Sequence, residues 1–133
     1  MQQTFKKQIS SLDGVFGFLE EALSPLTNDH AVTYPLQLAV EEFFTNMVKY
    51  NPESAKDILI GVEREGNVVR VAITDEDVEP FDPTQASLAD TSLDLAERPV
   101  GGLGIHLSRA LLDSIEYSYA DRRSTIILTK KVE

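Results

Sequence analysis

Two polar residues at helical spacing, Glu42 and Asn46, are the first candidates for chemistry in this chain. Positions i and i+4 lie one above the other on a helix, so this carboxylate and this carboxamide would form a pair of oxygen-bearing groups. A carboxylate can take a proton from a reacting hydroxyl group, and a carboxamide oxygen can bind a hard cation such as Mg²⁺. The alternative is that both side chains belong to the hydrated side of a surface helix.

Two further candidates follow later in the chain. Asp75 ends an alternating apolar segment, and its carboxylate could accept a hydrogen bond from an exocyclic amine such as that of adenine. Starting a turn is the common alternative use of Asp at such a position. Gly101, Gly102 and Gly104 precede and enter a helical pattern, where backbone N–H groups can close on a phosphate. A glycine loop can also simply cap a helix, and this run matches neither a Walker loop nor a dinucleotide fingerprint.

Composition excludes several other chemistries. The chain has no Cys and two His, so disulfides and Cys nucleophiles are excluded and a zinc site is not expected. There is no Gly-x-Ser-x-Gly nucleophile elbow, and the acidic run at 75–79 lacks the calcium-loop spacing. A net charge of −10 argues against nucleic-acid binding and is compatible with a basic protein partner. No secretory signal and no membrane-spanning apolar run are present, so we expect a cytoplasmic protein.

Two helices are predicted to position the first pair of candidates. The first follows a cap at Ser10 or Ser11 and ends at Ser24-Pro25. Its apolar positions are Leu12, Val15, Phe16, Leu19 and Leu23. The second has Thr33 as its cap and Pro35 in its first turn, and it stops at Asn51-Pro52. Its apolar stripe consists of Leu36, Val40, Phe43, Phe44 and Met47.

Strands are predicted where the apolar period changes to two. Residues 58–62 and 69–73 alternate on either side of Glu65-Gly66-Asn67, which predicts an antiparallel hairpin with one face on a core. Residues 2–9 are a candidate edge strand, and two last strands, at about 115–120 and 124–132, flank a turn at Ala120-Asp121-Arg122-Arg123.

The remaining stretch contains a long loop and a third helix. Residues 84–100 have no clear period, and a segment of this length is typical of a lid, a binding loop or disorder. The third helix would place Leu103, Leu107, Ala110, Leu111 and Ile115 on its apolar side. We therefore predict a single domain over 1–133 of the α+β class, a two-layer α/β sandwich. Its sheet would be mixed but mostly antiparallel, with three helices on one face.

The order and spacing of these motifs resemble the GHKL (histidine-kinase-like) ATPase superfamily over roughly residues 5–131. The resemblance lies in Glu42-Phe-Phe-Thr-Asn46, in Asp75 before Pro80-Phe81-Asp82-Pro83, and in Arg98-Pro-Val-Gly-Gly-Leu-Gly-Ile-His106-Leu. Within the superfamily, the chain is most similar to the small bacterial anti-sigma factors that are serine/threonine protein kinases. The resemblance implies a Bergerat-type ATP-binding fold, with ATP and Mg²⁺ as cofactors.

The resemblance also implies residue roles. Glu42 matches the catalytic base, Asn46 the Mg²⁺ ligand, and Asp75 the aspartate that holds the adenine amino group. Residues 84–100 match the ATP lid. Further cofactor-binding positions would be Asp77, Phe81, Arg98, Gly101, Gly102, Leu103, Gly104 and Thr125, with the glycines at the phosphates and the Thr125 hydroxyl near the adenine.

The first glycine box departs from the family pattern. The family has Asp-x-Gly, whereas this chain has Asp75-Glu76-Asp77 and one extra residue before Phe81. Two assignments of the adenine ligand, Asp75 or Asp77, therefore stay open. Two functions stay open as well. One is an anti-sigma kinase that phosphorylates a protein antagonist and sequesters a sigma factor, with a homodimer as the form often seen in relatives. The other is a protein-binding module of the same fold that binds ATP or has lost nucleotide binding, and that lacks phosphotransfer.

Overall fold

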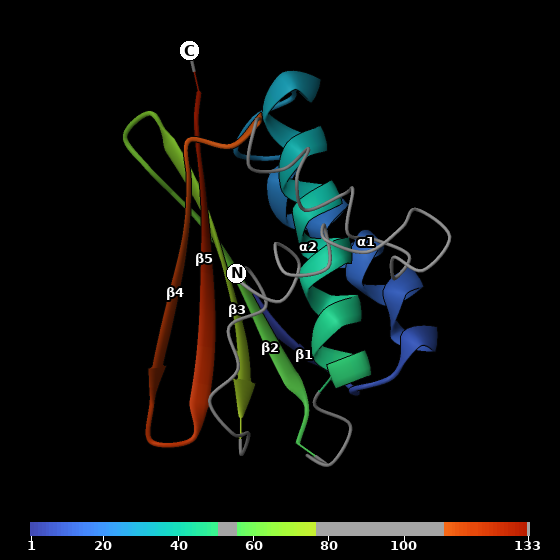
Figure 1. Cartoon of the computed structure of the whole chain (residues 1–133). Helices are drawn as coiled ribbons and strands as arrows, with labels where there is room; N and C mark the ends of the chain where they lie inside the picture. The colour runs from blue at the N-terminus through green and yellow to red at the C-terminus, as the bar shows by residue number, and fades with distance from the viewer. Residues whose placement is uncertain (51–55, 77–110, 133) are drawn as a thin grey trace, which may run out of the picture.

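Five antiparallel strands form one sheet, and two helices cover one of its faces in the computed structural model (Figure 1). The structure describes residues 1–50, 56–76 and 111–132. The strand order is β1-β2-β3-β5-β4, and every described pairing is antiparallel. The strands are β1 (Gln2–Phe5), β2 (Ile58–Glu65), β3 (Val68–Glu76), β4 (Ser114–Ala120) and β5 (Arg123–Lys131).

The helical layer consists of α1 (Leu12–Leu23), preceded by the single 3-10 turn η1 (Ile9–Ser11), and α2 (His30–Tyr50). The α+β sandwich is thus confirmed, but the predicted mixed sheet is wrong for the described strands. Two helices, not three, lie in the described part of the chain. The predicted third helix falls mostly on 101–110, outside the described residues, and its last position, Ile115, is wrong because Ile115 belongs to β4. No helix in the described ranges combines the length and apolarity needed to cross a membrane.

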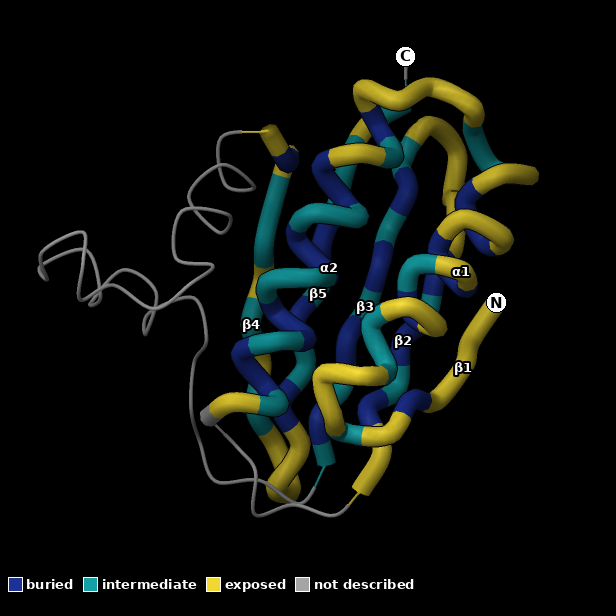
Figure 2. The backbone as a smooth tube through the Cα atoms, turned by 90° about the vertical axis from the view of Figure 1, so that its right-hand side faces the viewer, coloured by how far each residue is buried: buried dark blue, intermediate teal, exposed yellow. Residues whose placement is uncertain are grey.

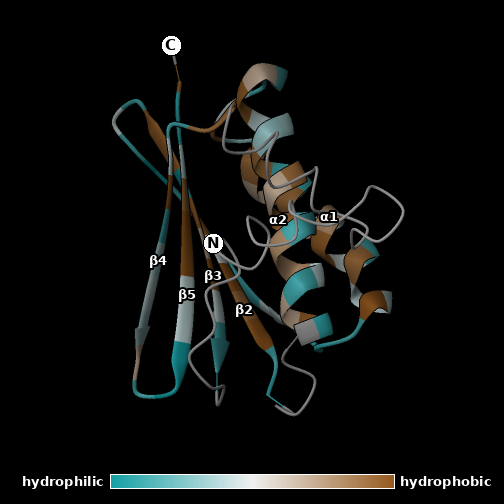
Figure 3. Ribbon diagram, in the orientation of Figure 1, coloured by the Kyte–Doolittle hydropathy of each residue, from teal (hydrophilic) through white to brown (hydrophobic). Residues whose placement is uncertain are grey.

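Helix α2 packs its predicted apolar stripe on the centre of the sheet. The five stripe residues, Leu36, Val40, Phe43, Phe44 and Met47, are at most 1% exposed. They belong to one core cluster with the inward-facing side chains of β3 and β5, among them Val71, Ile73, Ile126 and Leu128. Figure 2 shows these stretches of α2, β3 and β5 as buried, and Figure 3 shows apolar colouring along much of β2 and β5 and on parts of both helices. Burial of this stripe fixes which side of α2 faces the sheet.

The start of α2 differs from the prediction. The helix begins at His30, and Asp29 caps it: the Ala31 N–H donates to Asp29 Oδ1 at 2.9 Å. The N–H groups of Val32 and Thr33 donate to the Asp29 carbonyl. Pro35 therefore lies inside the helix and not in its first turn. Asp is a strong cap because its side chain accepts a hydrogen bond from an N–H group that has no intrahelical partner. The cap at Asp29 therefore sets the start of the helix, and not the position of Pro35.

Helix α1 covers the sheet beside α2. Val15, Leu19 and Leu23 are buried as predicted, but Phe18 is buried where Phe16 was expected. Phe18 contacts Phe5 of β1 edge to face, with ring centroids 5.6 Å apart. Ser11 is the N-cap residue of α1 as predicted, but its hydroxyl donates to the Lys6 carbonyl and makes no capping hydrogen bond. The first strand and the first helix are thereby joined at one end of the sandwich.

Both predicted hairpin turns are confirmed. The β2–β3 turn contains Gly66 at φ 61°, a conformation that glycine adopts without steric cost. The β4–β5 turn contains Asp121 at φ 54° and Arg122 at φ 61°. Positive φ at both central residues is typical of a two-residue turn whose twist matches that of the flanking strands.

Truncating the centre of the α2 stripe should severely destabilise the fold. Phe43→Ala removes a fully buried ring and leaves a cavity, so we expect a loss of about 3–5 kcal/mol in the free energy of unfolding, measured by urea denaturation. The matched control is Tyr34→Ala on the same helix, whose side chain is 60% exposed and should change stability by less than about 0.5 kcal/mol. Equal effects of the two changes would contradict the described packing.

Candidate active site

Glu42 and Asn46 lie on the C-terminal half of α2, beside the buried stripe. One helical turn separates them, about 6 Å along the axis. Asn46 is 8% exposed, and Glu42 is half-buried. Burial, helped by the charge of neighbouring Glu41, raises the pKa of Glu42 from 4.5 to about 7. A carboxyl group with a pKa near neutrality can take a proton at physiological pH and then release it.

A row of polar side chains crosses the sheet at the end where β3 finishes. Asp75 pairs with Ser124 of β5, and Ser124 pairs with Tyr119 of β4. Strand alternation places all three on the face that carries the helices, one row beyond the apolar pair Ile73 and Ile126. Directly opposed side chains have Cβ atoms about 5 Å apart. Asp75 and Ser124 are fully buried, so the core ends here in polar groups.

Asp75 is held by an ion pair that the sequence did not suggest. The ammonium group of Lys7, which follows β1, lies 2.6 Å from Asp75 Oδ1. The Lys7 side chain is 4% exposed and that of Asp75 is fully buried. The Ser124 hydroxyl next to them is buried and makes no hydrogen bond. A buried hydroxyl without a partner is unusual in a folded protein and marks a place where a ligand or water would bind.

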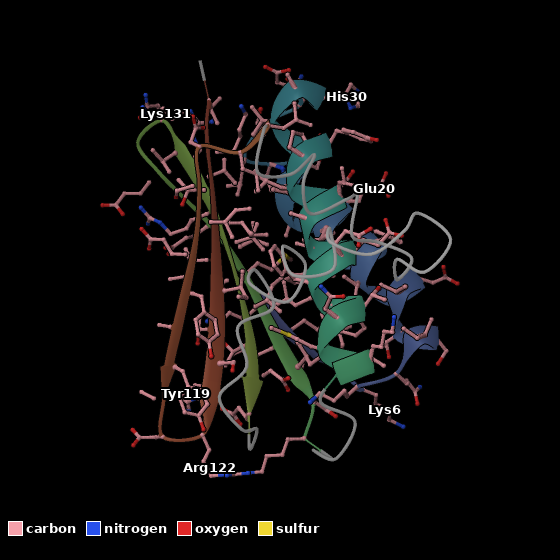
Figure 4. The ribbon with its side chains drawn as sticks, in the orientation of Figure 1. Lys6, Glu20, His30, Tyr119, Arg122 and Lys131 are labelled. Carbon is pink, nitrogen blue, oxygen red and sulfur yellow. The ribbon has the colours of Figure 1, made fainter. Side chains whose placement is uncertain are left out.

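The two halves of this site lie at the same end of the sandwich. The C-terminal ends of α2 and β3 both point to the lower end in Figure 1. Figure 4 labels Lys6, Tyr119 and Arg122 at that end, whereas His30 at the start of α2 is at the other. The structure thus brings the α2 pair and the Asp75 row to one end.

Thr125 does not lie beside Asp75. It pairs with Thr74, and alternation turns both side chains to the sheet face away from the helices. The hydroxyl that shares a face with Asp75 is that of Ser124, one residue earlier. The buried alternation of Ile126 and Leu128 could have identified Ser124 from the sequence. Lys7 had no such signal, because it follows the end of β1 at Phe5 and lies outside the strand alternation.

Several predicted site residues lie outside the described ranges, so their positions relative to Glu42 and Asp75 stay predictions. They are Asp77, Phe81, Arg98, Gly101, Gly102, Leu103 and Gly104, together with the whole predicted lid at 84–100.

The donor set on α2 fits Mg²⁺ better than a soft metal. Asn46 and Glu42 offer oxygen atoms, and Mg²⁺ is commonly held by one or two protein oxygens together with phosphate oxygens and water. No cluster of three or more His, Cys, Asp or Glu side chains suited to a metal occurs among residues 1–50, 56–76 and 111–132. A complete protein-only metal cage is therefore not found in that part of the chain.

A cavity among the described residues lies away from this pair. It has a volume of about 460 Å³ between the end of α1 and the start of α2, and its lining includes Glu20, Thr27 and His30. It lies at the end of α2 that is farthest from Asn46. None of the residues named in its lining is a carboxylate one helical turn away from a carboxamide, as Glu42 is from Asn46. We therefore assign the chemistry to Glu42 and Asn46.

The raised pKa of Glu42 makes a prediction for stability. Between pH 4.5 and about 7 the folded state binds a proton that the unfolded state has lost, so the free energy of unfolding falls as pH rises through this window. Glu42→Gln should therefore be roughly 1 kcal/mol more stable than the wild type at pH 8 and nearly equal to it at pH 4, after allowance for solvent screening of a half-buried group. Urea denaturation at both pH values measures this, with Glu21→Gln on exposed helix surface as the control. A pH-independent difference for Glu42→Gln would contradict the burial argument.

Comparison with solved structures supports the fold. The crystal structure of the RsbU and RsbW domains of Rv1364c from Mycobacterium tuberculosis matches with a TM-score of 0.69 and 19% identity over 98% of this chain. This chain covers 32% of the length of that structure. The histidine kinase AdeS of Acinetobacter baumannii matches with a TM-score of 0.56 and 13% identity, over 100% of this chain and 68% of that one. At these identities the likeness concerns the fold alone. Among curated proteins, no significant match is found.

The sequence itself matches a known domain family over nearly its whole length. The matched residues are 5–130, and the family is described as the histidine kinase-like ATPase domain. The match includes the α2 pair, the Asp75 row and the strands that carry them. This chain belongs to the histidine kinase-like ATPase domain family.

Proposed function

We propose that the protein is an ATP- and Mg²⁺-dependent serine/threonine protein kinase that acts as an anti-sigma regulatory factor. The observation that carries the proposal is the α2 pair, in which half-buried Glu42 has a pKa of about 7 and buried Asn46 lies one turn away. Membership of the ATPase domain family is the basis for proposing ATP as the nucleotide. The motif resemblance is the basis for proposing a protein substrate and an anti-sigma role.

Glu42 would act as the general base. Its carboxylate accepts the proton of a substrate Ser or Thr hydroxyl while that oxygen attacks the γ-phosphorus of ATP in line. A new bond forms between the substrate oxygen and phosphorus, the bond to the bridging oxygen of ADP breaks, and ADP leaves with the electron pair. A single base with its pKa near the working pH serves both proton uptake and release.

Asn46 would hold the metal through its carboxamide oxygen. Mg²⁺, when bound, would neutralise charge on the β- and γ-phosphate oxygens. Asp75 would meet the base of the nucleotide, since its carboxylate lies in a buried polar row beside the Ser124 hydroxyl. The family resemblance implies that Gly101, Gly102 and Gly104 lie at the phosphates and that the lid at 84–100 lies over the site. Arg98, at the end of the lid, would contact a phosphate or the protein partner.

The proposed partners follow from the motif resemblance. They are a sigma factor, sequestered by the protein, and an antagonist protein that is both substrate and competitor. An acidic chain with a net charge of −10 suits basic protein surfaces and disfavours direct contact with nucleic acid. We place this activity in the cytoplasm, where sigma factors act, and include a homodimer as the proposed assembly.

A second candidate function is a protein-binding module without phosphotransfer. The Lys7–Asp75 ion pair favours it, because an ammonium group 2.6 Å from Asp75 Oδ1 would compete with a base amine for this carboxylate. Calorimetry with ATP and Mg²⁺ separates the two. Heat of binding at micromolar to millimolar nucleotide supports the kinase, and no heat in that range supports the module.

Removing the proposed base should stop phosphate transfer and spare nucleotide binding. We expect Glu42→Ala to lower the transfer rate by at least about 100-fold, because a positioned base contributes about 10²–10⁴-fold. The measurements are phosphate transfer to the protein that co-purifies with the chain and ATP affinity by calorimetry. Glu21→Gln, on the exposed side of α1, is the control and should transfer at the wild-type rate. Undiminished phosphate transfer by Glu42→Ala would contradict the assignment of Glu42 as the general base.

The transfer rate should also depend on pH in a defined direction. A general base works only when ionised, so kcat/KM should rise between pH 6 and 8 and level off above the pKa of Glu42 near 7. Initial rates at constant ionic strength test this. A rate that is flat across pH 6 to 8 contradicts a Glu42 base with that pKa.

A further inference from the structure

The side chain of Lys7 is held at the base end of the site by the local fold and does not reach there as a free surface lysine. Phe5, two residues earlier, is buried and fixed by its edge contact with Phe18. A tight turn follows, in which the Gln8 N–H donates to the Lys6 carbonyl at 2.8 Å. The same carbonyl accepts the Ser11 hydroxyl at 2.8 Å. These contacts direct Lys7 inward while Lys6 stays exposed.

The ion pair changes what the base end offers to a ligand. A lone buried carboxylate offers two acceptor oxygens, which suits an exocyclic amine. Here one oxygen, Asp75 Oδ1, is 2.6 Å from an ammonium group that carries its own N–H donors. The adjoining Ser124 hydroxyl makes no hydrogen bond and can donate or accept. The polar row therefore presents donors as well as an acceptor, and its net charge is close to zero instead of −1.

A base amine cannot easily displace this ammonium group. The amine of a purine is neutral, whereas Lys7 brings a full charge at close range in a buried site, where such attraction is strong. Displacement would also break an ion pair inside the protein, which is costly. A nucleotide must share Asp75 with Lys7, and a purine with an oxygen at position 6 could accept a hydrogen bond from Lys7 instead.

From these contacts we propose that Lys7 is a specificity-determining residue of the nucleotide site, which weakens its preference for a 6-aminopurine over a 6-oxopurine by holding Asp75. The inference rests on the proposed function, since it takes the Asp75 row as the base end. It assigns to the N-terminal segment a direct part in nucleotide selection.

The test compares ADP with inosine diphosphate, which differs at the base by an oxygen in place of the amine. Calorimetry in Mg²⁺ at constant ionic strength gives both affinities for the full chain and its variants. Lys7→Met keeps the apolar stem and removes the charge, so the ADP-to-IDP affinity ratio should rise about tenfold or more, the worth of one hydrogen bond to a charged group. Lys6→Met is the matched control, and its ratio should stay within about twofold of the wild type.

Lys7→Gln is a second variant in case Lys7→Met does not fold. It keeps a neutral donor beside Asp75 and should raise the ADP-to-IDP affinity ratio by a smaller factor than Lys7→Met. A wild type that binds neither nucleotide while Lys7→Met binds ADP would support the role of Lys7 and would contradict the proposed kinase activity of the wild type. Binding by the wild type with an unchanged or lower ratio in both Lys7 variants overturns the role of Lys7 and leaves the proposed function standing. Absence of binding in every protein overturns both.

Discussion

The packing of one helix face on the middle of one sheet controls most of this structure. The α2 stripe is buried against β3 and β5, and this contact fixes the rotation of α2 about its own axis. Once that rotation is fixed, Asn46 and Glu42 must lie at the edge of the buried face, where they are partly removed from water. The chemistry proposed for Glu42 depends on this placement, because a fully hydrated carboxylate would keep an ordinary pKa and a fully buried one would be inaccessible.

Core and site are continuous at one end of the sandwich. Along β3 and β5 the inward row changes from Ile73 and Ile126 to Asp75 and Ser124 within a single step of strand alternation. The same strand geometry that builds the core therefore delivers polar groups to its end at fixed spacing. The Ser124 backbone is held between Asp75 of β3 and Tyr119 of β4, and groups held in place in this way lose little entropy on binding a ligand. Burying the Asp75 carboxylate and the Ser124 hydroxyl lowers the stability of the fold.

Lys7 offsets part of that cost and links the edge of the sheet to the site. Its charge compensates Asp75, and its position depends on Phe5, Phe18 and the turn before α1. A change in the N-terminal strand would thus reach the Asp75 row without touching any other residue of the family motifs. Glu42 differs from Asp75, because its raised pKa is caused by burial and by the like charge of Glu41. Ionising Glu42 near neutral pH therefore lowers the stability of the fold.

Local patterns determined much of this protein. The 3.6-residue period of the α2 stripe, the alternation of β2, β3 and β5, the glycine at the β2–β3 turn and the motif order were enough to predict the α+β sandwich and the family, because each depends on a neighbour within a few residues in the chain. The tertiary structure decided what depends on residues far apart. It paired Lys7 with Asp75, placed Ser124 and not Thr125 opposite Asp75 by register across β3 and β5, and raised the pKa of Glu42 by burial. It also chose Asp29 over Thr33 as the cap. The alternation of β5 indicates which face Ser124 lies on, but charge pairing, strand pairing and desolvation arise only when separate elements meet in space.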